Sequence, residues 1–202
     1  MHIAILTLEG YNELDSLIAL GVLNRIKGDD WRVTIATPTA KVTSMNGVVI
    51  EQMSTLQEAC EADAVIVGSG IATREVVQDP AIMEVLRRID PSHQVIAAQC
   101  SDALVLAKLG LLNDIPACTD LTTKLWVMAA GVEVLNQPFF AKDNLATAGG
   151  CLASHYLAAW LITRLRGKEA AEEACATWLR SARRRSTSPV PGATSRPTCL
   201  LT

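Results

Sequence analysis

Cys100 is the side chain of this sequence best placed to act as a nucleophile. A short apolar run, residues 95–99, ends directly before it, and a segment with the apolar periodicity of a helix follows. A cysteine at a strand-to-helix junction projects from the end of a sheet, beside a helix N-terminus and backbone N–H groups that stabilise negative charge. The pattern therefore predicts a nucleophile elbow. A buried structural thiol, the commoner state of cysteine, is the alternative.

The other cysteines lack this framing, and we expect Cys60, Cys118, Cys151 and Cys175 to be structural, with Cys118 near the same pocket. The six cysteines of the chain form no CxxC motif and no Cys/His pair, a usage typical of a reducing cytosol. We therefore expect a cytoplasmic protein without disulfides, without a metal site and without a cofactor.

The elements that would position Cys100 alternate along the chain between apolar runs and segments of helical period. This alternation predicts an α/β fold, a parallel sheet with helices on both faces. Asn46-Gly47 and Asp143-Asn144 are turn signals within two predicted hairpins, residues 41–50 and 139–147. The predicted strands are 3–8, 31–36, 64–68 and 95–99, and the predicted helices are 14–27, 73–89 and a mostly apolar one from Gly149-Gly150 to about 166.

Composition limits the classes of protein to consider. Of the 202 residues, 50% are hydrophobic, without an apolar run long enough to cross a bilayer, so we expect one soluble domain over residues 1–178 and no membrane partner. The opening residues lack the pattern of a signal peptide. A net charge of -3 argues against a nucleic-acid partner. Residues 179–202, rich in Arg, Ser and Pro and without Asp or Glu, predict a flexible basic tail.

Three segments together resemble the DJ-1/PfpI (ThiJ) superfamily. They are the Gln-Cys-Ser-Asp-Ala-Leu-Val-Leu-Ala-Lys-Leu-Gly-Leu-Leu-Asn stretch of residues 99–113, Ala-Cys-Thr-Asp-Leu-Thr at 117–122, and Asp-Asn-Leu-Ala-Thr-Ala-Gly-Gly at 143–150. Leu14-Asp15 and Gly68-Ser69-Gly70 add to the resemblance, which covers roughly residues 1–178. It implies a flavodoxin-like sheet sandwiched by helices, as in class I glutamine amidotransferases, and a homodimer.

The resemblance also implies roles for individual residues. Cys100 would be the nucleophile and Asp15 its acidic partner, while the backbone N–H groups of Gly70 and Ser101 would stabilise an oxyanion. The short acid and the serine after the cysteine resemble the isonitrile hydratase branch, in which Ser101 would position water or substrate. An isocyanide carbon needs attack by a soft thiolate together with delivery of a proton, and a thiol paired with a protonated acid can supply both. Without the family resemblance, the sequence indicates that Asp15 is an ordinary acid in the first turn of a helix, where the helix dipole stabilises it by about 0.3–1 kcal/mol.

Three features depart from the family pattern. Asp102 stands where relatives have a small residue, and a carboxylate facing the thiol would raise its pKa. Gly68-Ser69-Gly70 replaces Pro-Gly-Gly, and residues 117–122 lack the usual histidine. The tail also lacks the usual ending of relatives, which a frameshift would explain and the coding DNA would test.

The alternatives differ in the residues that they require. A PfpI-type protease would place histidine directly after the cysteine, where Ser101 stands. A glyoxalase or deglycase acting on small aldehydes remains an alternative enzyme, and a cysteine redox sensor is the non-enzymatic alternative. AraC-type regulators of the superfamily carry a further DNA-binding domain, which we do not expect after residue 179. The candidate pocket walls are Leu17, Ile18, Ile71, Trp126 and Phe140.

Overall fold

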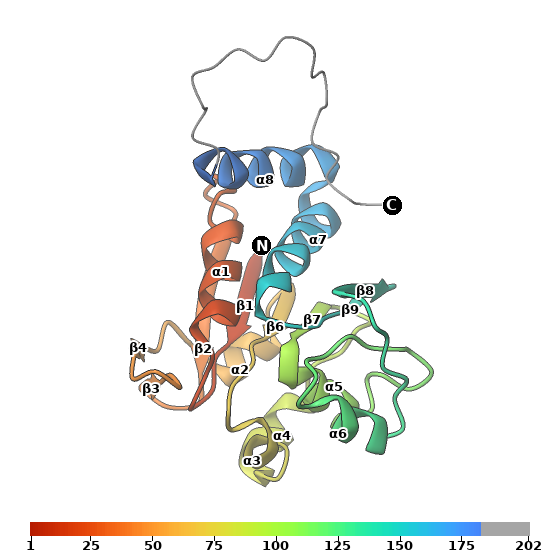
Figure 1. The fold of residues 1–202 in the computed structure, drawn as a ribbon. Coiled ribbons are helices and arrows are strands. Elements are labelled where there is room, and N and C mark those ends of the chain that lie inside the picture. The colour runs from red at the N-terminus through yellow and green to blue at the C-terminus, as the bar shows by residue number, and fades with distance from the viewer. Residues whose placement is uncertain (183–202) are drawn as a thin grey trace.

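The apolar runs of the sequence form one seven-stranded sheet (Figure 1). The computed structural model describes the backbone of residues 1–182 and the side chains of residues 1–176. All neighbouring strands in this sheet are parallel except the last pair. The strand order is β5 (Ser54–Thr55), β2 (Arg32–Thr37), β1 (His2–Leu6), β6 (Ala64–Val67), β7 (Val95–Gln99), β9 (Leu145–Ala148) and β8 (Phe139–Lys142). The predicted flavodoxin-like α/β fold is confirmed.

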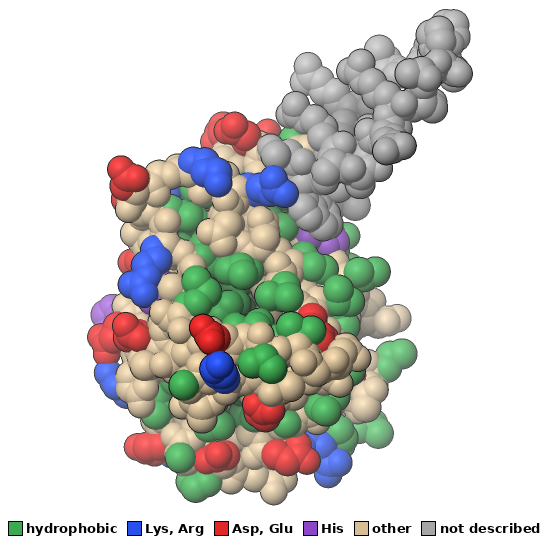
Figure 2. Space-filling model, turned by 90° about the vertical axis from the view of Figure 1, so that its left-hand side faces the viewer, with side chains coloured by type: hydrophobic (Ala, Val, Ile, Leu, Met, Phe, Trp, Pro, Cys, Tyr) green, Lys and Arg blue, Asp and Glu red, His purple; other side chains and the backbone are tan. Residues whose placement is uncertain are grey.

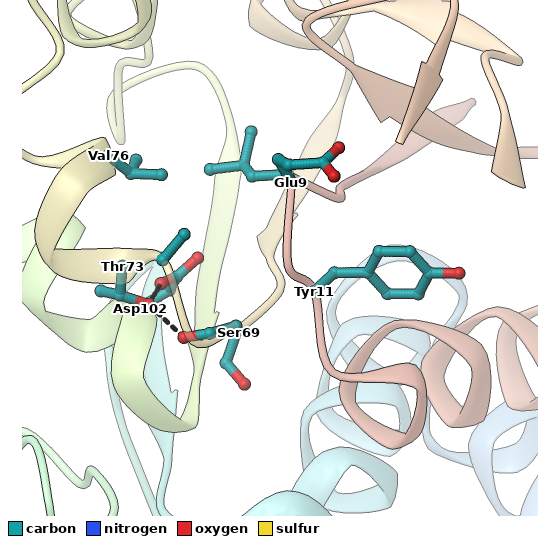
Figure 3. A pocket seen from close by; sticks show the side chains of 9 residues that line it. Glu9, Tyr11, Ser69, Thr73, Val76 and Asp102 are labelled. Atoms are coloured by element: carbon teal, nitrogen blue, oxygen red, sulfur yellow. Dashed lines mark hydrogen bonds between the residues drawn. The ribbon is translucent and has the colours of Figure 1, made fainter. Parts of the chain in front are cut away.

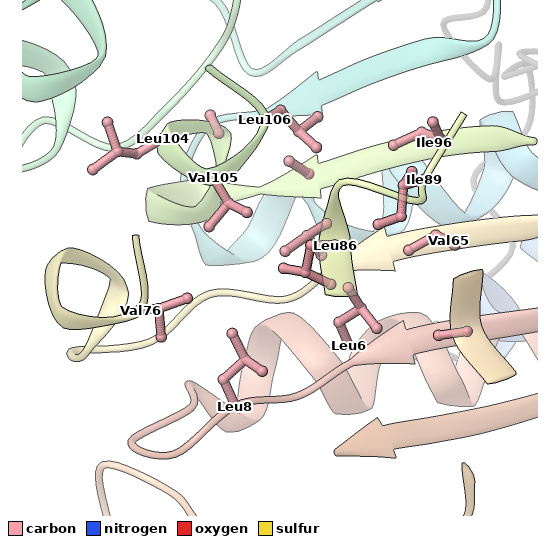
Figure 4. Packing of buried hydrophobic residues seen from close by; sticks show 14 of the residues in the cluster. Leu6, Leu8, Val65, Val76, Leu86, Ile89, Ile96, Leu104, Val105 and Leu106 are labelled. Atoms are coloured by element: carbon pink, nitrogen blue, oxygen red, sulfur yellow. The ribbon is translucent and has the colours of Figure 1, made fainter. Parts of the chain in front are cut away.

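Helices cover both faces of the sheet, as its continuous apolar strands require. One face packs against α1 (Glu13–Leu23), α7 (Ser154–Arg166) and α8 (Lys168–Ala182). The other face carries α2 (Leu56–Cys60), α3 (Thr73–Val76), α4 (Pro80–Leu86), α5 (Ala103–Lys108) and α6 (Lys124–Ala129). On this second face, Leu6, Val65 and Ile96 of three adjacent strands pack against Leu86 and Leu106 of the covering helices (Figure 4). The core therefore fixes the ends of the strands to which the site residues are attached.

One predicted helix is interrupted. Residues 73–89 form α3 and α4 rather than one helix, because Asp79 caps the second helix by accepting from the N–H groups of Ala81 and Ile82. Pro80 occupies the first position of α4, where its missing N–H costs no hydrogen bond. The predicted helix 14–27 ends earlier, at Leu23.

Both predicted hairpins form. The first pairs β3 (Lys41–Thr43) with β4 (Val49–Glu51) as a separate two-stranded sheet. The second pairs β8 with β9 and turns at Asp143, whose φ of 56° suits the tight turn.

The predicted boundary at residue 178 falls inside α8. Residues 183–202 of the predicted tail lie outside the described residues. Among the helices that the structure describes, none combines the length and the apolar character needed to cross a membrane.

The strand order places the loops that carry the candidate residues side by side. The order reverses at β1, which lies between β2 and β6, and ligands of doubly wound sheets bind beside such a reversal, at the carboxyl ends of the strands. The segments that follow β1, β6, β7 and β9 hold Asp15, Ser69, Cys100 and Cys151, respectively. Four strands that are neighbours in the sheet thus deliver four polar side chains to one edge.

Candidate active site

Cys100 has the backbone conformation of a nucleophile elbow. It connects β7 to a 3-10 turn, Cys100–Asp102, that leads into α5, and its φ is 53°. A side chain with a β-carbon in this left-handed region costs roughly 1–2 kcal/mol, so the surrounding structure must hold it there. The Thr119 hydroxyl does so by donating to the Cys100 carbonyl oxygen at 2.8 Å. The thiol is 8% exposed and lies at the start of a helical segment whose first N–H groups have no partner within the helix.

Asp15 lies beside this thiol. Its carboxyl group is fully buried in the first turn of α1, and one of its oxygens accepts from the Ser69 hydroxyl, which comes from the loop after β6. The ligand atoms of Asp15, Cys100 and Cys151 all lie within 4.8 Å of one another. The acid and the thiol that the family resemblance pairs are therefore adjacent.

The surroundings of Asp15 favour its protonated form. Burial raises the pKa of this carboxyl, and the hydrogen bond from Ser69 opposes the shift only in part. The Ser154 hydroxyl is 3.4 Å from the carboxyl but only 2.7 Å from the Cys151 carbonyl oxygen, which is the better acceptor for its single proton. A hydrogen bond from the Gln99 side chain also lowers the pKa of Asp15, so burial is the cause that outweighs these donors.

The pKa of the Cys100 thiol is strongly raised. Burial is the largest cause, followed by the charges of Asp15 and Asp120. A protonated Asp15 would remove its share of this repulsion and could then share the proton with a thiolate. Asp120 uses Oδ1 to accept from Thr122 N and Thr123 N, while its Oδ2 is buried without a hydrogen-bond donor among the described residues. Sequence reasoning missed Asp120 as the second acid near the thiol.

Asp102 does not crowd the thiol. Its side chain accepts from the Thr73 hydroxyl instead. Burial raises its pKa to about 8, opposed by the Thr73 hydrogen bond. Asp102, Ser69 and Thr73 line a small cavity of about 10 Å³, next to Tyr11 and Val76 (Figure 3). That volume suits about one water molecule, so this cavity is too small for an organic substrate.

The Ser101 hydroxyl makes its polar contacts with the segment that follows β6. It lies 2.7 Å from the Thr73 hydroxyl, 3.3 Å from the Gly70 carbonyl oxygen and 3.4 Å from the Gly70 nitrogen. Positioning water with Ser101 would require breaking one of these contacts. Gly70 is needed for close packing, since a β-carbon there would lie 2.6 Å from the Gly10 carbonyl oxygen. The roles of Ser101 and Gly70 in catalysis stay predictions.

Cys151 belongs to the site, although the sequence suggested a structural thiol. It follows β9 and begins the 3-10 turn Cys151–Ala153 that leads into α7, and its sulfur accepts from the Asn12 amide at 3.0 Å. The signal that could have revealed it resembles that of Cys100: an apolar strand, then two glycines, then the cysteine and a helix. Two sulfurs and a carboxylate could also coordinate a soft metal ion such as zinc, which sequence reasoning did not expect.

Cys118 is fully buried close to the site. Its backbone N–H donates to Thr147 Oγ1, and burial raises the pKa of its thiol to about 11. It therefore fits the structural role predicted for it.

The residues proposed as pocket walls do not converge on one cavity. Leu17 and Ile18 line a shallow groove of about 310 Å³ on the outer face of α1. Trp126 packs under the Arg74 guanidinium, whose central carbon is 4.4 Å from the ring centroid, and Ile71 is 68% exposed. Phe140 lies on β8, at the edge of the sheet.

An apolar surface surrounds the groove on α1. Leu14, Leu17 and Leu152 are all exposed there, and Leu152 belongs to the turn that contacts α1. Figure 2 views the side of the molecule that carries α1 and the β3–β4 hairpin, and hydrophobic side chains gather across the middle of this face.

The fold and the site together define an α/β protein with a cysteine at a nucleophile elbow and a buried acid beside it. The family model described as the DJ-1/PfpI family matches residues 1–164, and the chain belongs to this family.

Solved structures with the same fold include DJ-1 from Schizosaccharomyces pombe, with 15% identity and a TM-score of 0.76 over 88% of this chain and 98% of that one. A DJ-1 superfamily protein from Salmonella typhimurium is 23% identical, with a TM-score of 0.76 over 89% and 97% of the two chains. A ThiJ/PfpI family protein from Pseudomonas syringae is 20% identical, with a TM-score of 0.79 over 96% and 78%. No curated protein matches the sequence. At these identities the structural likeness establishes the fold alone.

Proposed function

We propose that this protein is a cysteine-dependent hydratase of small isocyanides, producing N-substituted formamides. The observation that carries the proposal is the buried Asp15 carboxyl, with a raised pKa, within 4.8 Å of the Cys100 sulfur at the elbow. Such a pair can hold one proton between a thiolate and a carboxylic acid, which suits attack on a carbon that must also be protonated.

The reaction proceeds in two stages. The Cys100 sulfur bonds to the terminal carbon of the isocyanide, and a proton passes from Asp15 to that same carbon, giving a thioimidate. Asp15, now ionised, takes a proton from a water molecule that attacks the thioimidate carbon. The carbon–sulfur bond then breaks and releases the Cys100 thiolate, and the proton of the added hydroxyl moves to the nitrogen to give the formamide. Asp15 again holds its proton, so the pair is restored and one water has been added to the isocyanide. Neither stage requires a cofactor.

The pair predicted for Cys100 consists of a thiol and an acid, without a histidine. The three histidines of the chain contact other groups. His2 contacts Thr34 Oγ1 at 2.8 Å, and His93 pairs with Asp90, while His155 Nδ1 lies against the Leu152 carbonyl oxygen. The acid next to the thiol is a carboxyl group, as the hydratase chemistry requires.

The test is formamide production from cyclohexyl isocyanide. Cys100→Ala should abolish turnover, and Asp15→Asn should lower it by roughly 10²–10⁴-fold, the usual contribution of a general acid. Cys60→Ala, which removes a thiol bonded to the Val85 carbonyl oxygen, is the matched control and should keep activity. Absence of turnover in the unmodified protein would refute the proposal, and conversion of methylglyoxal instead would favour the glyoxalase-like alternative.

We further propose that two copies of this chain associate through the apolar face of α1. Leu14 and Leu17 expose 48% and 38% of their surface there, and Leu152 exposes 74%. A contiguous apolar patch of this kind is typical of an interaction surface.

A further inference from the structure

The site contains two thiols where the proposed hydration needs one. Cys100 and Cys151 follow β7 and β9, which pair directly in the sheet, and both are free thiols. Their sulfur atoms lie within 4.8 Å of each other. Because both cysteines sit at strand ends that the sheet holds in register, their proximity is built into the fold.

The two thiols differ in access and in polar partners. Cys151 is partly exposed, whereas Cys100 is buried. The Asn12 amide donates to the Cys151 sulfur at 3.0 Å, and this sulfur lies at the start of the helical segment that continues into the 13-residue α7. An amide donor and a helix N-terminus both stabilise a thiolate. Burial and the charge of Asp15 nevertheless raise the pKa of both thiols, and the charge of Asp120 adds to the shift at Cys100. Cys151 is therefore the thiol that an oxidant in solvent reaches first.

We propose that Cys151 and Cys100 form a dithiol that reduces hydroperoxides. The Cys151 thiolate attacks the terminal peroxide oxygen, the O–O bond breaks, and the released alkoxide or hydroxide takes up a proton, leaving a sulfenic acid on Cys151. The Cys100 thiol then attacks the Cys151 sulfur and gives up its proton, while hydroxide leaves and is protonated to water. The two sulfurs have together lost two electrons and are joined by a disulfide. An external dithiol restores both thiols by exchange.

Asp15 fits the second step. Its carboxyl group lies within 4.8 Å of both sulfurs, which places it where a proton can pass to the leaving hydroxide. The proposal does not depend on isocyanide hydration. It differs from over-oxidation of one cysteine, because a disulfide stops the reaction before sulfinic acid forms.

The experiment treats the full-length protein with an equimolar amount of hydrogen peroxide in the presence of a metal chelator. Free thiols are then blocked by alkylation and the protein is mapped by mass spectrometry. We expect a Cys100–Cys151 disulfide that dithiothreitol reverses, and catalytic loss of hydroperoxide when dithiothreitol is supplied in excess.

Three variants assign the steps. Cys151→Ser should lower the rate of hydroperoxide loss at least tenfold. Cys100→Ser should be oxidised at close to the parent rate, but should accumulate a sulfenic acid at Cys151 that dimedone traps. Cys60→Ser is the control thiol and should behave as the parent. Thermal unfolding of each variant shows that it is folded.

Two outcomes would overturn the proposal. One is the absence of the Cys100–Cys151 disulfide in folded protein. The other is rapid oxidation of Cys100 in Cys151→Ser with Cys151 unmodified in Cys100→Ser. Neither outcome depends on hydratase activity, which is measured separately with the isocyanide.

Discussion

Asp102→Asn should change how the stability of the protein depends on pH. Asp102 is buried, and this burial raises its pKa to about 8 from an ordinary value of 3.8. The folded state therefore binds a proton that the unfolded state has lost. The contribution of this group to stability is fully present below the unfolded pKa and is lost as the pH rises through the folded one. Each pH unit within this window lowers the free energy of unfolding by about 1.4 kcal/mol.

At pH 7 the titration of Asp102 lowers the free energy of unfolding of the parent protein by about 4 kcal/mol. The reference is a pH below both the folded and the unfolded pKa of this group. Asparagine cannot titrate and keeps an oxygen in position to accept from Thr73. The free energy of unfolding of Asp102→Asn minus that of the parent should therefore grow by about 1.4 kcal/mol per pH unit between about pH 5 and pH 7.5, and level off above about pH 8.

Urea unfolding, followed by circular dichroism at constant ionic strength across this range, measures the difference. Asp15, whose charge contributes to the raised pKa of Asp102, is present in both proteins, so its own titration largely cancels. Parallel pH profiles for the two proteins would refute the reasoning, since they would mean that Asp102 keeps an ordinary pKa in the folded state.

Three further changes probe the site and the surface. Asp120→Asn keeps the oxygen that accepts from Thr122 N but removes a charge that raises the pKa of Cys100. Iodoacetamide should therefore alkylate Cys100 faster at a given pH. An unchanged rate of alkylation would exclude this effect of Asp120. Cys100→Gly should be about 1 kcal/mol more stable to urea than Cys100→Ala, because only glycine adopts a φ of 53° without strain, and equal stability would show an unstrained elbow. Leu17→Glu should shift the protein towards monomer in sedimentation velocity if the α1 face is the dimer interface, whereas a parent protein that is already monomeric would contradict the proposed homodimer.

Local sequence patterns were sufficient for most of the fold. The alternation of apolar runs and helical segments predicted the parallel sheet, and Asn46-Gly47 and Asp143-Asn144 marked both hairpins, because these signals act over a few residues. The error at residues 73–89 has the same local origin. Apolar periodicity continues through Pro80, while the Asp79 cap and the missing N–H of the proline begin a new helix there.

The site was only partly accessible to sequence reasoning. The pairing of Cys100 with Asp15 came from a family resemblance, and the structure places the two side chains together. Cys151 was expected to be structural because its framing was judged to differ from that of Cys100, yet the pairing of β7 with β9 brings it beside Cys100. The direction of Asp102, towards Thr73 and away from the thiol, depends on how the 3-10 turn after β7 packs against α3.

The sequence by itself determined most of the strands and helices and the place of Cys100 at a strand-to-helix junction, because backbone preferences and apolar periodicity are local properties. Only the tertiary structure decided which polar groups share the buried edge of the sheet. Strand order brings together residues more than a hundred positions apart, and burial then sets their protonation. Asp15, Cys100 and Cys151 become one chemical unit because adjacent strand ends place them in a space with little water.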